Sequence, residues 1–548
     1  MKKTRGCLLL LLVSLTSCTI GGGNFSWSKY ENTSTAMSLQ SAKFKNYKMP
    51  STTQDELDAL MEKVEKTVVE KGSVGTFVRD YSSLSSKIYK LFDSYIIAST
   101  KYYANADQEY KEISDKLYSM FNSVLAYIYQ LEYKIAESSD DIKEQYFGNM
   151  TDEEIQEYIS QNDKRIKETE YTEELQNYLD EGQELYMQVN NGTLSVDEYM
   201  NTGYEYFLRY IDKANEFMEE IDQPSFFNYA YPEMYSRDYS INDAMKFVEY
   251  VKKYLVPVYK KKKSLATPNN IDRRLLDALR SYNFCNTNAG GGSLFQNYAE
   301  ELGGSYLNAY NKMFKNGYYC FSNSLKSMST AYQWSLAGSN DSVLYFSKNY
   351  QSILTVVHEF GHYYSSQVSG GARNNDAYDL LETYSQADEY TFLNFLCESK
   401  KDDALADTYR YFAEAEYYSQ LQSIINDACI TEIENFAFST PDNTKYTLKA
   451  GCEDIIASYD DTASTTYFMV ACITNPCYYI SYATSVMEAM QFFDMSFEDA
   501  KTNYTELVES TKNMTMVERW ENAGLNSPFE EETFKKLAES FETIAAKY

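Results

Sequence analysis

Histidine is almost absent from this chain, because its 548 residues contain only His358 and His362. Proline and glycine are also scarce, with 8 and 22 residues, while Leu, Glu, Lys, Ala and Met recur with helical spacing over long stretches. Few chain-breaking residues and good helix formers favour a mainly α-helical protein. A chain of this length is expected to form one large body or two to three domains.

Basic side chains are outnumbered as well, at 50 Lys and Arg against 80 Asp and Glu, which gives a formal net charge of −30. Binding to nucleic-acid phosphates requires basic patches, so this balance excludes nucleic acid as a partner. Most of the acidic side chains are expected on solvated helix faces.

Two further absences concern cysteine pairs and apolar runs. The nine cysteines include no CxxC pair, so neither a zinc ribbon nor a dense disulfide framework is indicated. Beyond the N-terminus, the best candidate for a membrane span is residues 467–487, and Asn475 and Pro476 interrupt it. We therefore expect no transmembrane helix in the body of the protein.

The N-terminus has the pattern of an export signal. Residues 1–17 combine a basic start with an apolar run too short for a stable membrane span, which predicts a signal peptide. The sequence Leu-Thr-Ser-Cys resembles a bacterial lipobox, so we expect a lipid on Cys18 that anchors the protein outside the cytoplasm; the alternative is an ordinary signal with a chance cysteine. Residues 18–51, rich in Gly, Ser, Asn and Thr, are predicted to form a flexible tether.

Most of the chain beyond the tether has helical periodicity. We predict an N-terminal helical domain over residues 52–200 and a catalytic domain over 201–548, with Pro257 ending or bending a helix. The clearest hairpin is formed by two β-rich runs, 332–336 and 343–346, directly before the histidines. The main helices are predicted over residues 54–72, 76–104, 107–138, 195–221, 240–254 and 294–315.

The two histidines stand four positions apart, in the sequence His-Glu-Phe-Gly-His. On a helix this spacing puts both imidazoles on one face, where they can bind a single ion. Glu359 follows the first histidine, so its carboxylate would lie beside the ion and could take a proton from a zinc-bound water that attacks a carbonyl. Two histidines placed at random would show this arrangement in about one chain in several thousand, so we predict a metal site rather than a pair of core histidines.

A catalytic zinc site needs a third protein ligand and one open position. No histidine remains, and a carboxylate on the following helix would suit. Glu382, which follows His362 by twenty residues, would face the histidines from that helix. Glu389 lies two turns further on the same face, and Ser385 or Gln386 could hydrogen-bond a ligand; for Glu389 a solvated face is the alternative. The acidic residues of this segment are Asp376, Asp379, Glu382, Asp388 and Glu389.

His-Glu-Phe-Gly-His, followed at this distance by Glu-Thr-Tyr-Ser-Gln-Ala-Asp-Glu, resembles the thimet oligopeptidase and oligoendopeptidase F family of zinc metallopeptidases. The resemblance extends over about residues 232–548, with weaker similarity at 427–438, 475–485 and 521–528. It implies one Zn²⁺ ion with Glu382 as the third ligand, and a large helical zincin-type body with a deep substrate channel. It also implies that the substrates are short unstructured oligopeptides, which could pair with an edge strand of the hairpin.

One feature departs from the family pattern. Members usually carry a histidine just upstream of a tyrosine-rich segment, where it helps to stabilise the oxyanion; the matching place here is near Cys472, and one tyrosine position reads Ile480. Tyr478, Tyr479 and Tyr482 remain as candidate catalytic donors. The alternative for each is simple packing against helical neighbours.

The sequence therefore predicts a zinc-dependent endopeptidase acting on oligopeptides, with Glu359 as the base. One alternative is a lipoprotein that binds peptides without cleaving them. Another is a related helical zinc carboxypeptidase, which requires a basic group for the substrate carboxylate, and Arg373 is the nearby arginine.

Overall fold

The computed structural model describes residues 38–548 with several gaps. The gaps are residues 163–170, 281–290, 340, 370–375, 441–442, 461–464 and 511–513 and scattered positions between 172 and 192. The predicted signal peptide, the lipobox residue Cys18 and Arg373 lie outside the described residues.

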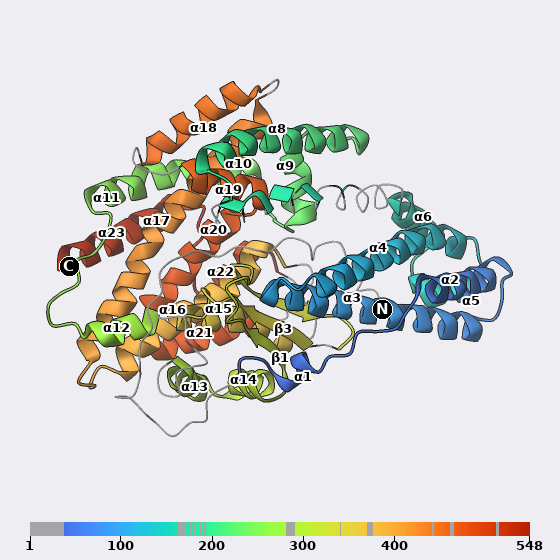
Figure 1. Ribbon diagram of the computed structural model, residues 1–548, viewed down its shortest axis with the longest axis horizontal. Coiled ribbons are helices and arrows are strands. Elements are labelled where there is room, and N and C mark those ends of the chain that lie inside the picture. Colours follow the sequence, from blue (N-terminus) through green and yellow to red (C-terminus); the bar gives the residue numbers. More distant parts are fainter. Residues whose placement is uncertain are drawn as a thin grey trace.

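The N-terminal helices form a bundle in which α3 packs along α4 and α2 contacts both. Figure 1 shows this bundle at one end of the long axis. Polar residues at Thr53, Ser73, Asp107 and Thr151 accept hydrogen bonds from the first turns of their helices, which stabilises these helix starts. The helices are α2 (Gln54–Val69), α3 (Val74–Asn105), α4 (Gln108–Ala136), α5 (Asp140–Phe147) and α6 (Asp152–Ser160).

The rest of the described chain is also mainly helical, with three short strands, so the prediction of a mainly α protein is confirmed. The helices that follow the bundle are α8 (Val196–Glu220), α9 (Phe226–Tyr229), η1 (Ala230–Met234), α10 (Ile241–Tyr250), η2 (Val251–Leu255), α11 (Val256–Lys261), α12 (Arg273–Arg280), α13 (Gly291–Leu302) and α14 (Gly304–Asn316). After the strands come α15 (Ile353–Ser369), α16 (Tyr378–Ser399), α17 (Ala406–Ser439), α18 (Lys445–Tyr459), α19 (Thr465–Thr474), α20 (Ile480–Ala489), η4 (Met490–Phe493), α21 (Phe497–Glu509), α22 (Met516–Asn522) and α23 (Glu531–Lys547).

Two predicted helices differ from the structure. The helix expected over residues 294–315 is broken into α13 and α14, because Gly303 and Gly304 adopt φ angles of +67° and +49° that interrupt the helix and are easy only for glycine. The helix expected over residues 240–254 passes from α10 into the π-helical turn η2, and α11 then begins with Pro257 in its first turn. Proline is tolerated there because the first turn needs no amide donor, so the helical path continues past Pro257.

A three-stranded sheet with the order β1-β3-β2 lies beside α15. Strands β2 (Ala331–Leu336) and β3 (Asp341–Phe346) form the predicted hairpin, with Tyr332 opposite Tyr345. Strand β1 (Tyr318–Phe321) was not predicted, and it pairs with β3 in parallel. The prediction of a small sheet next to the metal helix is confirmed.

Residues close to the start of the described chain pack on the β1 edge of this sheet. The N–H of Phe321 donates to the carbonyl of Leu39 at 2.7 Å, and helix α1 (Ala42–Lys45) buries Phe44 to 1% exposure. Lys43 Nζ lies 2.7 Å from an oxygen of Asp341. This part of the predicted flexible tether, residues 18–51, is therefore folded onto the body, because Phe44 is buried and Tyr47 and Met49 pack against the same core.

The sheet separates two hydrophobic cores. The first core contains the buried residues of helices α1 to α6 together with Val343 and Tyr345 of β3. The second core contains most of the buried residues from Tyr171 onward, including Leu344 and Phe346. Successive side chains of a strand point to opposite faces, so each face of β3 belongs to one core. The domain boundary expected at residue 200 stays a prediction.

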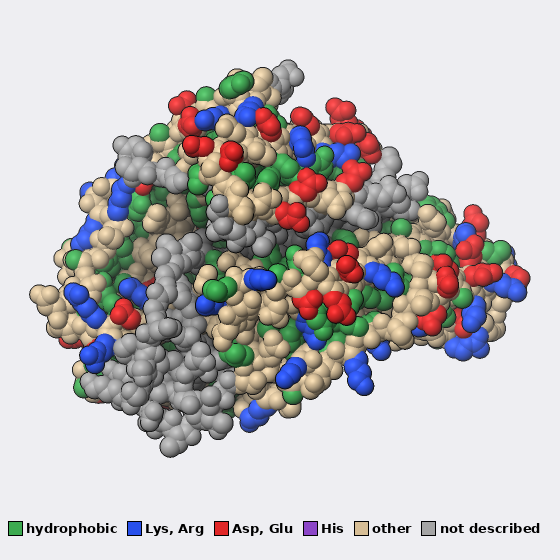
Figure 2. Space-filling model, viewed as in Figure 1, with side chains coloured by type: hydrophobic (Ala, Val, Ile, Leu, Met, Phe, Trp, Pro, Cys, Tyr) green, Lys and Arg blue, Asp and Glu red, His purple; other side chains and the backbone are tan. Residues whose placement is uncertain are grey.

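The surface carries the acidic character of the sequence. On the face drawn in Figure 2, acidic side chains gather over α8 and α18 and over the N-terminal bundle, with lysines and arginines between them. Within the described ranges, no helix is both long and apolar enough to cross a membrane.

Candidate metal centre

Helix α15 presents both histidines on one face. The ring centroids of His358 and His362 lie 4.9 Å apart, and their planes are nearly perpendicular at 84°. Their side chains keep 12% and 17% exposure although the neighbouring helix positions are buried. Both rings are thus held in the interior but remain reachable by a small molecule or ion.

Gly361, between the two histidines, allows α16 to approach α15 closely. A Cβ atom at Gly361 would lie 2.7 Å from the Cα of Ser385, which is shorter than any normal contact. The close approach brings Glu382, three residues before Ser385, next to the histidines. The glycine of His-Glu-Phe-Gly-His is therefore required by helix packing and not by its conformational freedom.

His358, His362 and Glu382 have the spacing of zinc ligands. Oε2 of Glu382 lies 3.4 Å from Nε2 of His358 and 3.6 Å from Nε2 of His362, and ligand atoms of all three lie within 4.8 Å of one another. Tetrahedral bonds of about 2.1 Å to zinc would put ligand atoms about 3.4 Å apart. Oε2 of Glu382 is also buried and accepts no well-formed hydrogen bond from the described residues. The three residues fit a zinc ion.

Other groups hold the ligands in place. Oε1 of Glu382 accepts a hydrogen bond from the hydroxyl of Tyr478, and Nδ1 of His358 lies 2.7 Å from Oε1 of Glu389. Burial disfavours the charged ring of His358, but Glu382 and Glu389 raise its pKa well above the usual value. Burial opposes the charge of Glu382 too, and the two histidines outweigh it and lower the pKa of this carboxyl.

Glu359 lies between the metal helix and the sheet. It is only 4% exposed, and burial raises its pKa although the charges of His358 and His362 lower it. The backbone N–H of Gln333, in strand β2, donates a hydrogen bond to it. A carboxylate with a raised pKa beside a metal site is suited to accept a proton.

No protein-family model matches the sequence, and no curated protein is significantly similar to it. Solved structures do match. An X-ray structure described as an oligoendopeptidase F superposes with a TM-score of 0.68 and 14% identity, over 93% of this chain and 99% of that one. The chain has the oligoendopeptidase F fold.

Two other solved structures support this assignment of the fold. PZ peptidase A with an inhibitor has a TM-score of 0.68 at 14% identity, over 92% of this chain and 99% of that one. Metallocarboxypeptidase 1 of Trypanosoma cruzi has a TM-score of 0.53 at 11% identity, over 87% and 98% of the two chains. The oligoendopeptidase F fold is thus shared with proteins named for different peptidase activities, and at these identities the likeness establishes the fold alone.

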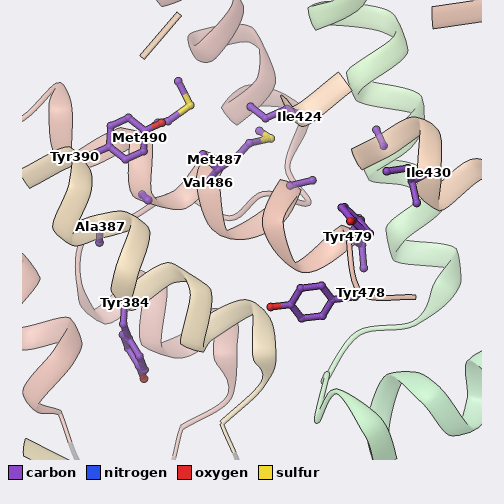
Figure 3. Packing of buried hydrophobic residues seen from close by; sticks show 14 of the residues in the cluster. Tyr384, Ala387, Tyr390, Ile424, Ile430, Tyr478, Tyr479, Val486, Met487 and Met490 are labelled. Atoms are coloured by element: carbon purple, nitrogen blue, oxygen red, sulfur yellow. The ribbon is translucent and has the colours of Figure 1, made fainter. Parts of the chain in front are cut away.

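The three candidate tyrosines have different surroundings. Figure 3 shows the hydroxyl of Tyr478 pointing toward α16, where it donates to Glu382. The ring of Tyr482 packs edge-on against Tyr478 at 5.0 Å, and Tyr479 contacts Tyr482 at 6.1 Å. The hydroxyl of Tyr478 is therefore already hydrogen-bonded to the candidate ligand Glu382. Cys472, near the place where the resemblance implies a histidine, is fully buried in α19.

The other acidic residues of the α16 segment face different partners. Asp376 accepts a hydrogen bond from Tyr384, Asp388 accepts from two tyrosines, and Asp379 pairs with Arg237. The hydroxyl of Ser385 donates to the backbone carbonyl of Glu382 and not to a ligand side chain. Oε1 of Gln386 is buried and has no hydrogen-bond partner among the described residues.

Sequence reasoning missed Arg237. It lies 142 positions before Asp379, and no local motif marks it.

Proposed function

We propose that the protein is a zinc-dependent endopeptidase that hydrolyses short, unstructured oligopeptides. The observation that carries the proposal is the spacing of 3.4 and 3.6 Å between Oε2 of Glu382 and the two imidazole nitrogens, which fits tetrahedral zinc. The oligoendopeptidase F fold supports a peptidase in which these residues serve as ligands.

His358, His362 and Glu382 would hold one zinc ion, which when bound polarises a peptide carbonyl and lowers the pKa of water to about 7. Glu359 takes a proton from the attacking water and delivers it to the nitrogen of the leaving amine. Tyr482 is the tyrosine best placed to donate to the developing oxyanion, because the hydroxyl of Tyr478 is bound to Glu382.

The substrate would add to the sheet as an extended strand. Strand β2 is at one end of the strand order, and the N–H of its Gln333 donates to Glu359. A peptide paired beside β2 would bring its main chain next to this carboxylate. Main-chain pairing gives affinity with little dependence on side chains, which suits a general oligopeptidase.

A carboxypeptidase is the second candidate activity, favoured by the similarity of the fold to metallocarboxypeptidase 1. The two activities differ in products, because an endopeptidase cuts internal bonds and a carboxypeptidase removes one residue at a time. A peptide-binding protein without activity is the third candidate, and the buried Glu359 beside the site argues against it.

The test is cleavage of a quenched peptide library by the purified full chain, with and without a chelator. We expect cleavage that stops with chelator and returns with zinc, and internal products by mass spectrometry. Glu359→Gln should keep its zinc and lose about 10²- to 10⁴-fold in rate. Stepwise loss of C-terminal residues would favour the carboxypeptidase, and binding without cleavage would favour the peptide-binding protein.

We also propose that the protein is an extracytoplasmic lipoprotein attached to the cell membrane through Cys18. The support is the signal-like segment of residues 1–17 and the lipobox sequence. Cys18→Ser should move the protein from the membrane fraction to the soluble fraction and remove the lipid mass from its N-terminal peptide. Retention of the variant in the membrane fraction would contradict lipid anchoring.

A further inference from the structure

Arg237 pairs with Asp379 at the start of α16, close to the candidate metal centre. Its side chain is fully buried, at 0% exposure. Its Nε donates to Asp379 at 2.9 Å, and its Nη2 donates to the hydroxyl of Ser481 at 2.7 Å and reaches the carbonyl of Tyr478 at 3.4 Å. The guanidinium carbon lies 4.4 Å from the ring centre of Tyr235. A planar guanidinium can make these contacts in several directions at once, which a lysine ammonium cannot reproduce.

The turn that leads to Tyr478 is held in an unusual conformation. Cys477 has a φ of +64°, in the left-handed region that non-glycine residues rarely adopt. The N–H of Cys477 donates to Glu434 at 2.7 Å, and the carbonyl of Pro476 accepts from the hydroxyl of Tyr235 at 2.6 Å. Together with Arg237, these contacts fix the backbone immediately before and at Tyr478.

The same arginine also fixes the other end of the contact between Tyr478 and Glu382. Asp379, its ion-pair partner, lies one turn before Glu382 on α16, so the two carboxylates share a face of the helix. Asp379 accepts two more hydrogen bonds from hydroxyls of α20, those of Ser481 and Thr484, both at 2.7 Å. The start of α16 and the segment after Tyr478 are thus locked to each other.

We infer that Arg237 is a positioning residue, which fixes the orientation of the proposed zinc ligand Glu382 through Tyr478. The phenol of Tyr478 occupies Oε1 of Glu382 and leaves Oε2 as the oxygen directed at the histidines. Glu382 is thereby oriented to bind zinc through Oε2 alone. The full burial of Arg237 separates it from any peptide, so it does not serve as a receptor for a substrate carboxylate. The inference rests on the zinc site of the proposed function, but not on cleavage.

The test is a double-mutant cycle on zinc affinity, measured on the full chain by competition with a chelator. Arg237→Lys keeps the charge and removes the guanidinium, and Tyr478→Phe removes only the hydroxyl. Loss of a group that orients a ligand typically weakens metal binding by about 10- to 100-fold, and we expect this for each variant. Because part of the effect of Arg237 on Glu382 passes through Tyr478, the loss of zinc affinity in the double variant should be smaller than the product of the two single losses.

The matched control is Tyr459→Phe, which removes a buried phenol bound to Glu432 at 2.7 Å, away from the metal centre. Its zinc affinity should equal that of the wild type. The metal-free variants are compared by circular dichroism and thermal melting. If Arg237→Lys fails to fold, Ser481→Ala takes its place in the cycle, because it removes one contact of Arg237 and one of Asp379 and preserves every charge.

The outcomes separate this inference from the proposed function. Unchanged zinc affinity in either single variant, or losses that multiply in the double variant, would overturn the positioning role. Non-multiplying losses in a chain that cleaves no peptide would support the positioning role and refute the endopeptidase. A wild-type chain that binds no zinc would overturn both.

Discussion

Nδ1 of His358 lies 2.7 Å from Oε1 of Glu389, so the imidazole donates its Nδ1 proton to this carboxylate and presents Nε2 to Glu382. A histidine that binds a metal through one nitrogen is commonly held through the other by a carboxylate, which fixes the tautomer and the ring orientation. Glu389 therefore supports a candidate ligand, and the alternative of a solvated surface carboxylate does not describe its contact.

Removing this support should weaken metal binding. We expect Glu389→Ala to lower zinc affinity by about 10- to 100-fold, because the ring of His358 loses its orientation. Chelator competition measures the change. The control is Glu398→Ala on the same helix, whose carboxylate is 55% exposed and pairs only weakly with Lys401 at 3.5 Å. Equal zinc affinities for both variants would contradict a supporting role for Glu389.

Close packing at Gly361 leads to a second prediction. Gly361→Ala puts a methyl group 2.7 Å from the Cα of Ser385, so α15 and α16 must separate. We expect a loss of about 1–3 kcal/mol in the free energy of unfolding and weaker zinc binding, because Glu382 moves away with α16. Denaturant unfolding and zinc titration measure the two effects.

The control for Gly361 is Gly75→Ala in helix α3, where no atom lies within 4 Å of the added carbon. Its stability should stay the same or rise slightly, because alanine favours helices over glycine. If Gly361→Ala is as stable as this control and binds zinc normally, the close approach of the two helices is not required.

Asp388 should make stability depend on pH. Burial raises its pKa to about 8, although the hydroxyls of Tyr298 and Tyr306 lower it, and in an unfolded chain the value is about 3.9. The folded protein therefore keeps a proton that the unfolded chain releases. The stability that this group contributes is complete below about pH 4 and is lost as the pH rises through about 8.

Asp388→Asn removes this titration. We expect the Tm of the wild type to fall more steeply than that of the variant between about pH 5 and 8, because only in the wild type does unfolding release the proton that buried Asp388 keeps in the fold. Scanning calorimetry across this range gives both profiles. Parallel profiles would show that Asp388 ionises equally in the folded and unfolded chains.

The N-terminal segment offers a prediction about stability alone. Phe44 is 1% exposed and packs with the first core, so Phe44→Ala should cost about 3–5 kcal/mol in the free energy of unfolding. Leu325, which is 87% exposed, provides the control, and Leu325→Ala should change stability by less than about 0.5 kcal/mol. Similar unfolding curves for both variants would mean that the segment does not stabilise the body.

Local patterns predicted much of the candidate site. The spacing of His358 and His362 implied a shared helix face, and the separation of Glu382 from them implied the next helix; the structure brings all three together. The hairpin was predictable because two β-rich runs flank a short turn. These features depend on neighbours close in sequence.

Contacts between distant segments were not predictable. Strand β1 pairs with β3 in parallel, and such pairing leaves no turn signal between the strands. The bond from Tyr478 to Glu382 joins residues 96 positions apart, and nothing in a run of tyrosines tells which one will face a carboxylate. The segment around Phe44 looked like a linker because its composition is polar, and the packing of Phe44, Tyr47 and Met49 outweighs that composition.

The position of β3 between the two cores has a mechanical consequence. Val343 and Tyr345 pack in the first core, while Leu344 and Phe346 pack in the second. Sliding the N-terminal bundle past helix α15 would therefore disrupt the packing of both sets of side chains at once. We therefore expect the bundle and the helix that carries both histidines to move as a single unit.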